Sequence, residues 1–202
     1  MNFSAVILAG GQSSRMGRDK ARVEISGETL LARQIKLVRV AGAAEVLISG
    51  RADRDDTQFG LRVLTDNFPS SGPLAGIESA LRVCRTPLLL VLAVDMPHMT
   101  AEFLQQLQRQ CGGGSGILPR RAGQLEPLAA FYPRAAAQIA TELLLQSKAS
   151  PGITSPGVGF FASRCVSEAL AHFYDLPADC AKYFTNWNEP QDVLGSSASD
   201  GF

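Results

Sequence analysis

Hydrophobic and polar positions fall along the chain in blocks that are typical of strands followed by helices. Residues Phe3–Ala9 form a nearly continuous apolar run that ends at Gly10, and Leu88–Val94 form a second run that ends at Asp95. Short continuous apolar runs are typical of strands buried on both faces of a parallel sheet. Further strands are predicted at Glu45–Ser49, Arg62–Thr65, Gly116–Pro119, Pro127–Phe131 and Tyr183–Trp187.

In the segments between these strands, apolar residues recur at the spacing of a helix. Pro73 suits the first turn of a helix, where the missing N–H removes no hydrogen bond, and Thr100 is a suitable N-cap. The segment Val158–Ala171 is ambiguous and favours a helix over a strand. Helices are therefore predicted from Leu30 to Gly42, from Pro73 to Cys84, from Thr100 through Leu107, from Pro133 to Lys148, and over Val158–Ala171.

Alternating strands and helices predict an α/β protein, a three-layer α/β/α sandwich around a mostly parallel, Rossmann-like sheet. The 202 residues contain no internal repeat or linker, so residues 1–194 are predicted to form a single domain. The Ser- and Gly-rich end, 195–202, is expected to be a flexible tail. Ligands of such sheets bind beyond the carboxyl ends of the strands. By that rule, three places that follow predicted strands are candidate ligand-binding sites: Gly10–Lys20, Asp66–Gly76 and Asp95.

Composition narrows the function classes. The chain has 19 Lys and Arg against 19 Asp and Glu, and this balance argues against a broad nucleic-acid or anionic-membrane footprint. The apolar N-terminal run is too short for a signal peptide or a membrane span, so a soluble, cytoplasmic protein is expected. The cysteines are widely spaced and form no CxxC pair, which predicts free thiols: Cys84, Cys111, Cys165 and Cys180.

The segment from Leu8 to Lys20 combines a strand end, two adjacent glycines, two serine hydroxyls and several cations, among them Arg15 and Lys20. Glycines let backbone N–H groups approach a polyanion closely, and the cations neutralise phosphate oxygens. The segment is neither a Walker A loop nor the dinucleotide fingerprint GxGxxG. It predicts a triphosphate-binding loop, with a structural turn carrying solvated charges as the alternative.

Several motifs, in order along the chain, resemble those of one family. Leu8-Ala-Gly-Gly-x-Ser-x-Arg-Met-Gly-x-Asp-Lys20 resembles the signature of the molybdenum cofactor guanylyltransferases (MobA), which have the nucleoside-diphospho-sugar transferase fold. The resemblance continues through Asp66 with Gly72–Gly76, Val94–Pro97, Glu126–Ala130 and Asn186–Pro190. These motifs cover most of the chain.

The resemblance implies transfer of GMP from magnesium-bound GTP to molybdopterin, with release of pyrophosphate. It implies that Arg15 and Lys20 bind the β and γ phosphates and that Asp95 binds Mg²⁺. The nucleotide would also contact Leu8, Ala9, Gly10, Gly11 and the side chain of Asp66. Ser49 stands where relatives often carry a nucleotide-binding asparagine. Asn186 and Asn188 would complete the metal or acceptor site or, alternatively, form Asx turns.

Other interpretations remain open at this stage. Asp95 could instead cap the next helix, and Asp66 could belong to a turn. Within enzymes, the alternatives are a CTP-dependent relative acting on the same pterin and a nucleotidyltransferase for another small phosphate. Gly10-Gly11 after Ala9 favours the guanylyl branch, because cytidylyl relatives tend to show Ala-Ala-Gly. A non-catalytic protein that delivers the cofactor to apo-molybdoenzymes is the alternative from another class.

Overall fold

The computed structural model describes residues 1–10, 20–25, 27–50, 57–149 and 157–185. A mixed sheet forms the centre of this part of the chain. Strand β9 runs antiparallel to both of its neighbours, whereas the other strands of the row run in one direction. The order across the sheet is β10 (Ala171–Asp175), β7 (Gly116–Arg121), β9 (Ala129–Pro133), β6 (Leu88–Ala93), β1 (Phe3–Leu8), β4 (Glu45–Ser49) and β5 (Arg62–Leu64), with β8 (Gln124–Leu125) paired to β7.

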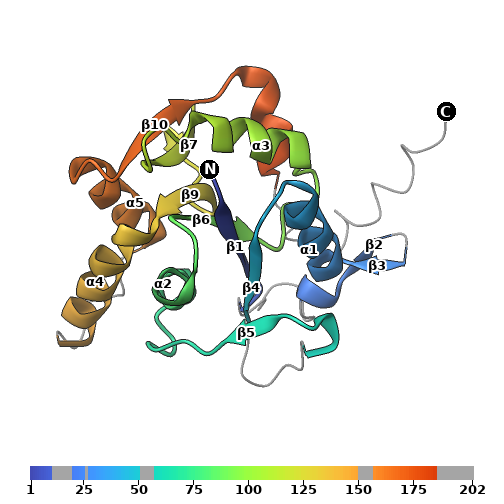
Figure 1. The fold of residues 1–202 in the computed structure, drawn as a ribbon, viewed down its shortest axis with the longest axis horizontal. Helices are drawn as coiled ribbons and strands as arrows, with labels where there is room; N and C mark the ends of the chain where they lie inside the picture. Colours follow the sequence, from blue (N-terminus) through green and yellow to red (C-terminus); the bar gives the residue numbers. More distant parts are fainter. Residues whose placement is uncertain (11–19, 26, 51–56, 150–156, 186–202) are drawn as a thin grey trace.

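Helices cover both faces of this sheet, which confirms the predicted three-layer sandwich (Figure 1). One face carries α1 (Leu30–Val40) and α3 (Ala101–Gln110). The other face carries α2 (Pro73–Val83), α4 (Ala137–Ala149) and α5 (Val158–Ser167). Shorter elements complete the described fold: the hairpin β2 (Glu24–Ile25) with β3 (Glu28–Thr29), and the 3₁₀ turns η1 (Lys20–Arg22), η2 (Thr57–Phe59), η3 (Arg134–Ala136) and η4 (Ala178–Phe184).

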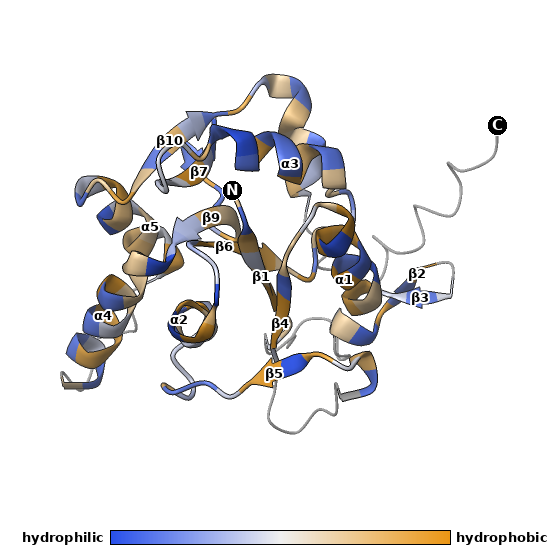
Figure 2. Ribbon diagram, viewed as in Figure 1, coloured by the Kyte–Doolittle hydropathy of each residue, from blue (hydrophilic) through white to orange (hydrophobic). Residues whose placement is uncertain are grey.

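The central strands β1 and β6 are buried on both faces. Ala5 and Ile7 of β1 pack toward α1 and α3, whereas Val6 packs toward α2. All of β6 is buried, from Leu88 to Ala93. The hydropathy colouring shows this apolar centre and a largely hydrophilic outer side on α3 (Figure 2). Because a fully buried leucine contributes about 1.5–3 kcal/mol, this strand pair is a major source of stability.

The predicted helix starts are confirmed. The Thr100 hydroxyl accepts a hydrogen bond from the amide of Phe103 at 3.3 Å, as an N-cap does. Helix α2 begins with Pro73 directly after Gly72, whose φ of 70° lies in the left-handed region that favours glycine. The entrance to α2 is therefore set by this Gly-Pro pair.

The strand predicted at Tyr183–Trp187 is wrong over the residues that the structure describes. Tyr183 and Phe184 belong to η4, and both rings pack on Phe103 of α3, with centroid distances of 4.4 and 5.6 Å. Aromatic residues in a short apolar run are compatible with a strand or with a packed turn. Here ring stacking on α3 decides the outcome.

The segment Val158–Ala171 divides into a helix and the start of a strand. Helix α5 ends at Ser167, and Ala169 adopts a φ of 56°, which turns the chain out of the helix. Strand β10 then begins at Ala171 and pairs with β7 in parallel. The predicted strand Pro127–Phe131 is shifted as well, because β9 spans Ala129–Pro133.

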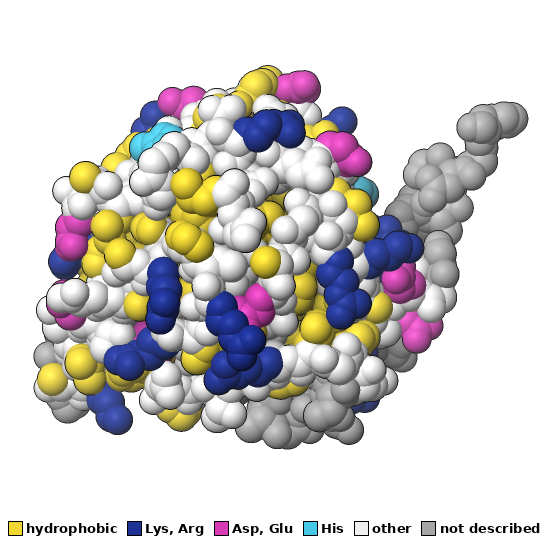
Figure 3. All heavy atoms as spheres, in the orientation of Figure 1, with side chains coloured by type: hydrophobic (Ala, Val, Ile, Leu, Met, Phe, Trp, Pro, Cys, Tyr) yellow, Lys and Arg dark blue, Asp and Glu magenta, His cyan; other side chains and the backbone are white. Residues whose placement is uncertain are grey.

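The other predicted strands and helices are confirmed to within a few residues at their ends. All four cysteines are buried free thiols, as predicted. None of the helices in the described part of the chain has the length and hydropathy needed to span a bilayer. On the face shown in Figure 3, Lys and Arg side chains form separate groups with hydrophobic and uncharged atoms between them. The predicted tail 195–202 lies outside the described residues.

Close packing of α2 on the sheet generates a stability prediction. A Cβ on Gly76 would overlap the Ser49 hydroxyl at the end of β4. We expect Gly76→Ala to lower the free energy of unfolding by about 1–3 kcal/mol, measured by urea denaturation, because overpacking displaces the helix. The loss should be smaller in a Ser49→Ala background.

Gly159 of α5 is the matched control, because a Cβ there meets nothing within 4 Å. Gly159→Ala should leave the free energy of unfolding unchanged or raise it by up to about 1 kcal/mol. Equal losses for Gly76→Ala with and without Ser49→Ala would contradict the assigned clash.

Candidate active site

Four neighbouring strands end at one edge of the sheet and place the predicted site residues in a row. Asp95 follows β6, Gly10 follows β1, Ser49 ends β4, and Asp66 follows β5. These strands are parallel, so their carboxyl ends share this edge. From β6 to β5 the row spans three strand spacings, or about 14 Å. The topology therefore puts Asp66 and Asp95 on opposite sides of Gly10.

Backbone hydrogen bonds continue past the strand ends. The amide of Ala9 donates to the Ser49 carbonyl at 2.8 Å, and the amide of Val94 donates to the Leu8 carbonyl at 3.2 Å. Beyond them, Gly10 lies against the backbone of Gly50, since a Cβ on Gly10 would be 3.4 Å from the Gly50 carbonyl oxygen. The chain therefore leaves the sheet at Gly10 in a confined position.

Asp95 is half-buried in the turn after β6. Helix α1 supports this turn, because the buried Gln34 donates through Nε2 to the carbonyl of Met96 at 2.8 Å. The amide of Met99 donates to the same carbonyl at 3.3 Å. The carbonyl of Met96 thus accepts hydrogen bonds from Gln34 and from Met99. These two bonds restrict the neighbouring backbone that carries Asp95.

Asp66 carries a partly buried carboxyl group whose surroundings disfavour its ionised form. Burial raises the pKa of Asp66, and the nearby Glu78 carboxylate raises it further. Its Oδ1 atom is buried without a hydrogen-bond partner in the described structure. A buried acceptor without a donor is costly, so this atom is suited to N–H donors from a ligand.

Ser49 lies at the expected strand end, but its side chain is buried and faces α2. It is 5% exposed, and its hydroxyl lies where a Cβ on Gly76 would be. The structure therefore places this side chain in the packing between β4 and α2, beneath the row of strand ends.

The remaining predicted residues lie at the limits of the described chain. Lys20 begins η1, which contacts α1. Four others, Gly11, Arg15, Asn186 and Asn188, lie outside the described residues. The structure thus brings together Leu8, Ala9, Gly10, Asp66 and Asp95 along the carboxyl edge.

Sequence reasoning did not select a charged pair at the same edge beyond Asp95. The guanidinium of Arg121, at the end of β7, donates to Glu126 at 3.3 Å, and burial raises the pKa of Glu126 while Arg121 opposes that rise. The amide of Ala93 donates to the carbonyl of Leu128 at 2.9 Å, so this segment adjoins the end of β6. The motif Glu126–Ala130 was the only feature of the sequence analysis that included a member of this pair.

The donor set fits a magnesium ion that also binds phosphates. The described residues contain no group of three or more His, Cys, Asp or Glu side chains arranged to hold a metal. Magnesium in phosphoryl-transfer sites needs only one or two carboxylates beside phosphate oxygens and waters. Asp95 would supply such a carboxylate at this edge.

The sequence of this chain is similar over most of its length to known nucleotide transferases. The family described as MobA-like NTP transferase domain matches residues 5–155. A probable molybdenum cofactor guanylyltransferase of Opitutus terrae is 37% identical over 193 residues, covering 94% of this chain and 92% of the relative.

Two solved structures show the same fold. The molybdopterin-guanine dinucleotide biosynthesis protein A of Archaeoglobus fulgidus superposes with a TM-score of 0.71 at 23% identity, covering 96% of this chain and 97% of the other. The 2-C-methyl-D-erythritol 4-phosphate cytidylyltransferase of Thermus thermophilus gives 0.70 at 19% identity, covering 98% of each chain.

The raised pKa of Asp66 generates a prediction about stability. Its folded pKa lies above the ordinary value of 3.8, so the ionised carboxylate destabilises the fold at neutral pH. We expect Asp66→Asn to unfold at higher urea concentration than the wild type at about pH 7. This advantage should shrink as the pH falls through the raised pKa toward 3.8, because the wild-type carboxyl is then protonated. An advantage that grows at low pH would contradict the assignment.

Proposed function

Because the chain belongs to the MobA-like NTP transferase family, we propose that it transfers GMP from GTP to the terminal phosphate of molybdopterin. The products are molybdopterin guanine dinucleotide and pyrophosphate. The name of the Opitutus terrae relative supports this reaction. The observation that carries the proposal is the row of strand ends with Asp66 and Asp95 on either side of Gly10.

We propose that Asp66 reads the guanine base. A carboxylate accepts from two adjacent N–H groups, and guanine presents them at N1 and at the 2-amino group. Cytosine has no such pair, so this contact distinguishes GTP from CTP. The buried Oδ1 atom without a partner in the described structure supports this role, since the base would supply its donor.

The triphosphate is assigned to the segment after β1 and to the turn after β6. In this proposal Arg15 and Lys20 bind the β and γ phosphates, with backbone contacts from Leu8 through Gly11. A cation about 4 Å from a phosphate charge contributes up to about 4 kcal/mol before desolvation at an effective dielectric near 20. Asp95 would hold Mg²⁺, which neutralises phosphate charge when bound.

The reaction needs no general base. An oxygen of the acceptor phosphate, already ionised at neutral pH, attacks the α-phosphorus of GTP in line. The bond from the α-phosphorus to the bridging oxygen breaks, and pyrophosphate leaves with the electron pair. Arg15 and Lys20 stabilise the charge on the leaving group, and the backbone of Gly10 and Gly11 orients the α-phosphate.

The acceptor is assigned to the half of the edge beyond Asp95. Asn186 and Asn188, outside the described residues, remain proposed contacts of the acceptor or of the metal. Buried free thiols support a reducing compartment, so the reaction is proposed for the cytoplasm, with apo-molybdoenzymes as recipients of the product. A CTP-dependent enzyme has the same fold, as the Thermus thermophilus structure illustrates, so the nucleotide preference has to be measured.

Calorimetric binding of GTP, CTP, ATP and UTP with magnesium tests the nucleotide assignment. We expect the wild type to prefer GTP and Asp66→Ala to lose about 1–3 kcal/mol of this discrimination, the range for one bidentate base contact. Equal selectivity in the variant would remove Asp66 from base reading. A preference for CTP would move the protein to the cytidylyl branch.

Pyrophosphate release in the presence of molybdopterin tests the role of Asp95. We expect Asp95→Ala to reduce magnesium-dependent turnover by a factor of about 100 or more, because charge neutralisation at the triphosphate is lost. Its thermal unfolding should stay close to that of the wild type, since the side chain lies at a strand end and only half-buried. Glu102→Ala, an exposed carboxylate on α3, is the control. Turnover of Asp95→Ala equal to that of the control would exclude Asp95 from the mechanism.

A further inference from the structure

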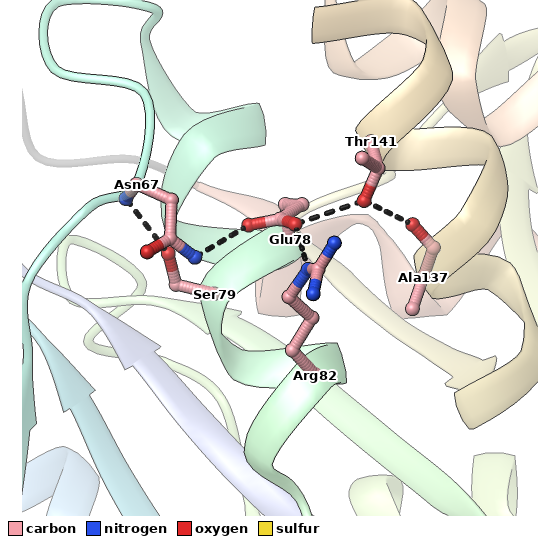
Figure 4. A network of polar contacts seen from close by, with 6 residues as sticks. All are labelled: Asn67, Glu78, Ser79, Arg82, Ala137 and Thr141. Atoms are coloured by element: carbon pink, nitrogen blue, oxygen red, sulfur yellow. Dashed lines mark hydrogen bonds and ion pairs between the residues drawn. The ribbon is translucent and has the colours of Figure 1, made fainter. Parts of the chain in front are cut away.

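Helix α2 carries a carboxylate that is completely buried, Glu78. Three side chains surround it (Figure 4). Asn67 donates through Nδ2 to its Oε2 atom at 3.1 Å, and Arg82 donates through Nε to Oε1. The Thr141 hydroxyl lies 2.8 Å from Oε1 and 2.9 Å from the Ala137 carbonyl, so its single proton has two acceptors. Asn67 and Arg82 are therefore the consistent donors to Glu78.

A buried carboxylate is an expensive way to stabilise a helix. Removing a charged group from water costs several kcal/mol, and a well-packed apolar residue is often as stabilising as a buried ion pair. The other buried positions of α2 are apolar or small: Leu74, Ala75, Gly76, Ile77, Ser79, Ala80 and Leu81. Packing alone therefore does not account for an acid at position 78.

The contact with Asn67 connects Glu78 to the base-reading turn. Asn67 directly follows Asp66 and is bound to α2 twice, by its side chain to Glu78 and by its amide to the Ser79 hydroxyl at 3.3 Å. Two bonds to adjacent helical residues restrict the backbone at position 67. The position of Asp66 relative to the sheet edge depends on that backbone.

Glu78 also acts on Asp66 through space. Its charge adds to the effect of burial in raising the pKa of Asp66, whose Oδ1 atom has no donor in the described structure. An unpaired acceptor beside a second negative charge gains more from N–H donors than an isolated one. The restraint through Asn67 and the charge of Glu78 thus both act on the carboxylate of Asp66.

We propose that Glu78 is a positioning residue for guanine recognition: by anchoring Asn67 to α2 it fixes the turn on which Asp66 meets the base. This inference rests on the proposed role of Asp66. It assigns nucleotide selectivity partly to a side chain that is 0% exposed and would therefore act through Asn67 and Asp66. Arg82 and Thr141 complete the surroundings of Glu78 on the side of α4.

The test compares GTP with ITP, which lacks the 2-amino group of guanine. The variants are Glu78→Gln, which keeps the shape and removes the charge, and Asn67→Ala, which removes the side-chain bond between the turn and Glu78 but keeps the amide bond to Ser79. We expect each to raise KM for GTP roughly tenfold and to reduce the preference for GTP over ITP by a similar factor. The kcat at saturating GTP should change less than about threefold, because the phosphate site is untouched.

Thr86→Val is the matched control for losing a buried polar contact. The Thr86 hydroxyl bonds to Ser4 at 2.9 Å and to the Leu88 carbonyl at 2.7 Å, at the amino ends of β1 and β6. This variant should lose stability and keep the wild-type GTP-to-ITP ratio, since it lies at the opposite edge of the sheet. A change of the ratio in Thr86→Val as large as in Asn67→Ala would overturn the proposal.

The variant Asp66→Ala distinguishes a failure of the proposed role of Asp66 from a failure of the proposed role of Glu78. A wild type without preference for GTP over ITP would overturn both the base-reading role of Asp66 and the role of Glu78. A preference that Asp66→Ala abolishes, but that Asn67→Ala and Glu78→Gln retain, would overturn the role of Glu78 alone. If Glu78→Gln does not fold, the ratio in Asn67→Ala decides.

Discussion

The burial of β1 and β6 on both faces is the constraint on which the rest of the structure depends. Each strand is covered by helices above and below, so neither has an open face for polar chemistry. Polar residues can follow these strands only where the chain leaves the sheet. Because β6, β1, β4 and β5 are parallel, those exits coincide at one edge. The position of the candidate site is thus a consequence of the way in which the core is buried.

Both acidic turns of this edge are supported from beneath by a buried polar side chain on a helix. Gln34 of α1 holds the carbonyl of Met96, next to Asp95, and Glu78 of α2 holds Asn67, next to Asp66. Buried polar groups reduce the apolar surface that each helix contributes to the core, and they require their partners to be well placed. The two helices therefore do more than cover the sheet, because they also restrict the turns that carry the acids.

Charge is arranged unequally along the edge. Asp66 lies in a partly buried, negatively charged environment with Glu78, which suits donors such as the N–H groups of a base. Beyond Asp95, the charge of Arg121 at the end of β7 is balanced by its own ion pair with Glu126. In the proposed reaction the base and the acceptor phosphate occupy opposite ends of this row. One sheet edge can thereby separate recognition of the nucleotide from recognition of the acceptor.

The sequence by itself determined the central strands, the helices between them, the helix starts at Thr100 and Pro73, and the acids after β5 and β6. These features depend on local patterns: continuous apolar runs, helical spacing and the chemistry of helix starts. Tertiary structure decided the rest. The aromatic residues of η4 pack on α3 rather than extend the sheet, β10 follows α5 at the sheet edge, and β9 runs antiparallel. It also decided that Ser49 packs against Gly76 and that Glu78 reaches Asn67, because contacts between residues distant in the chain have no period in the sequence.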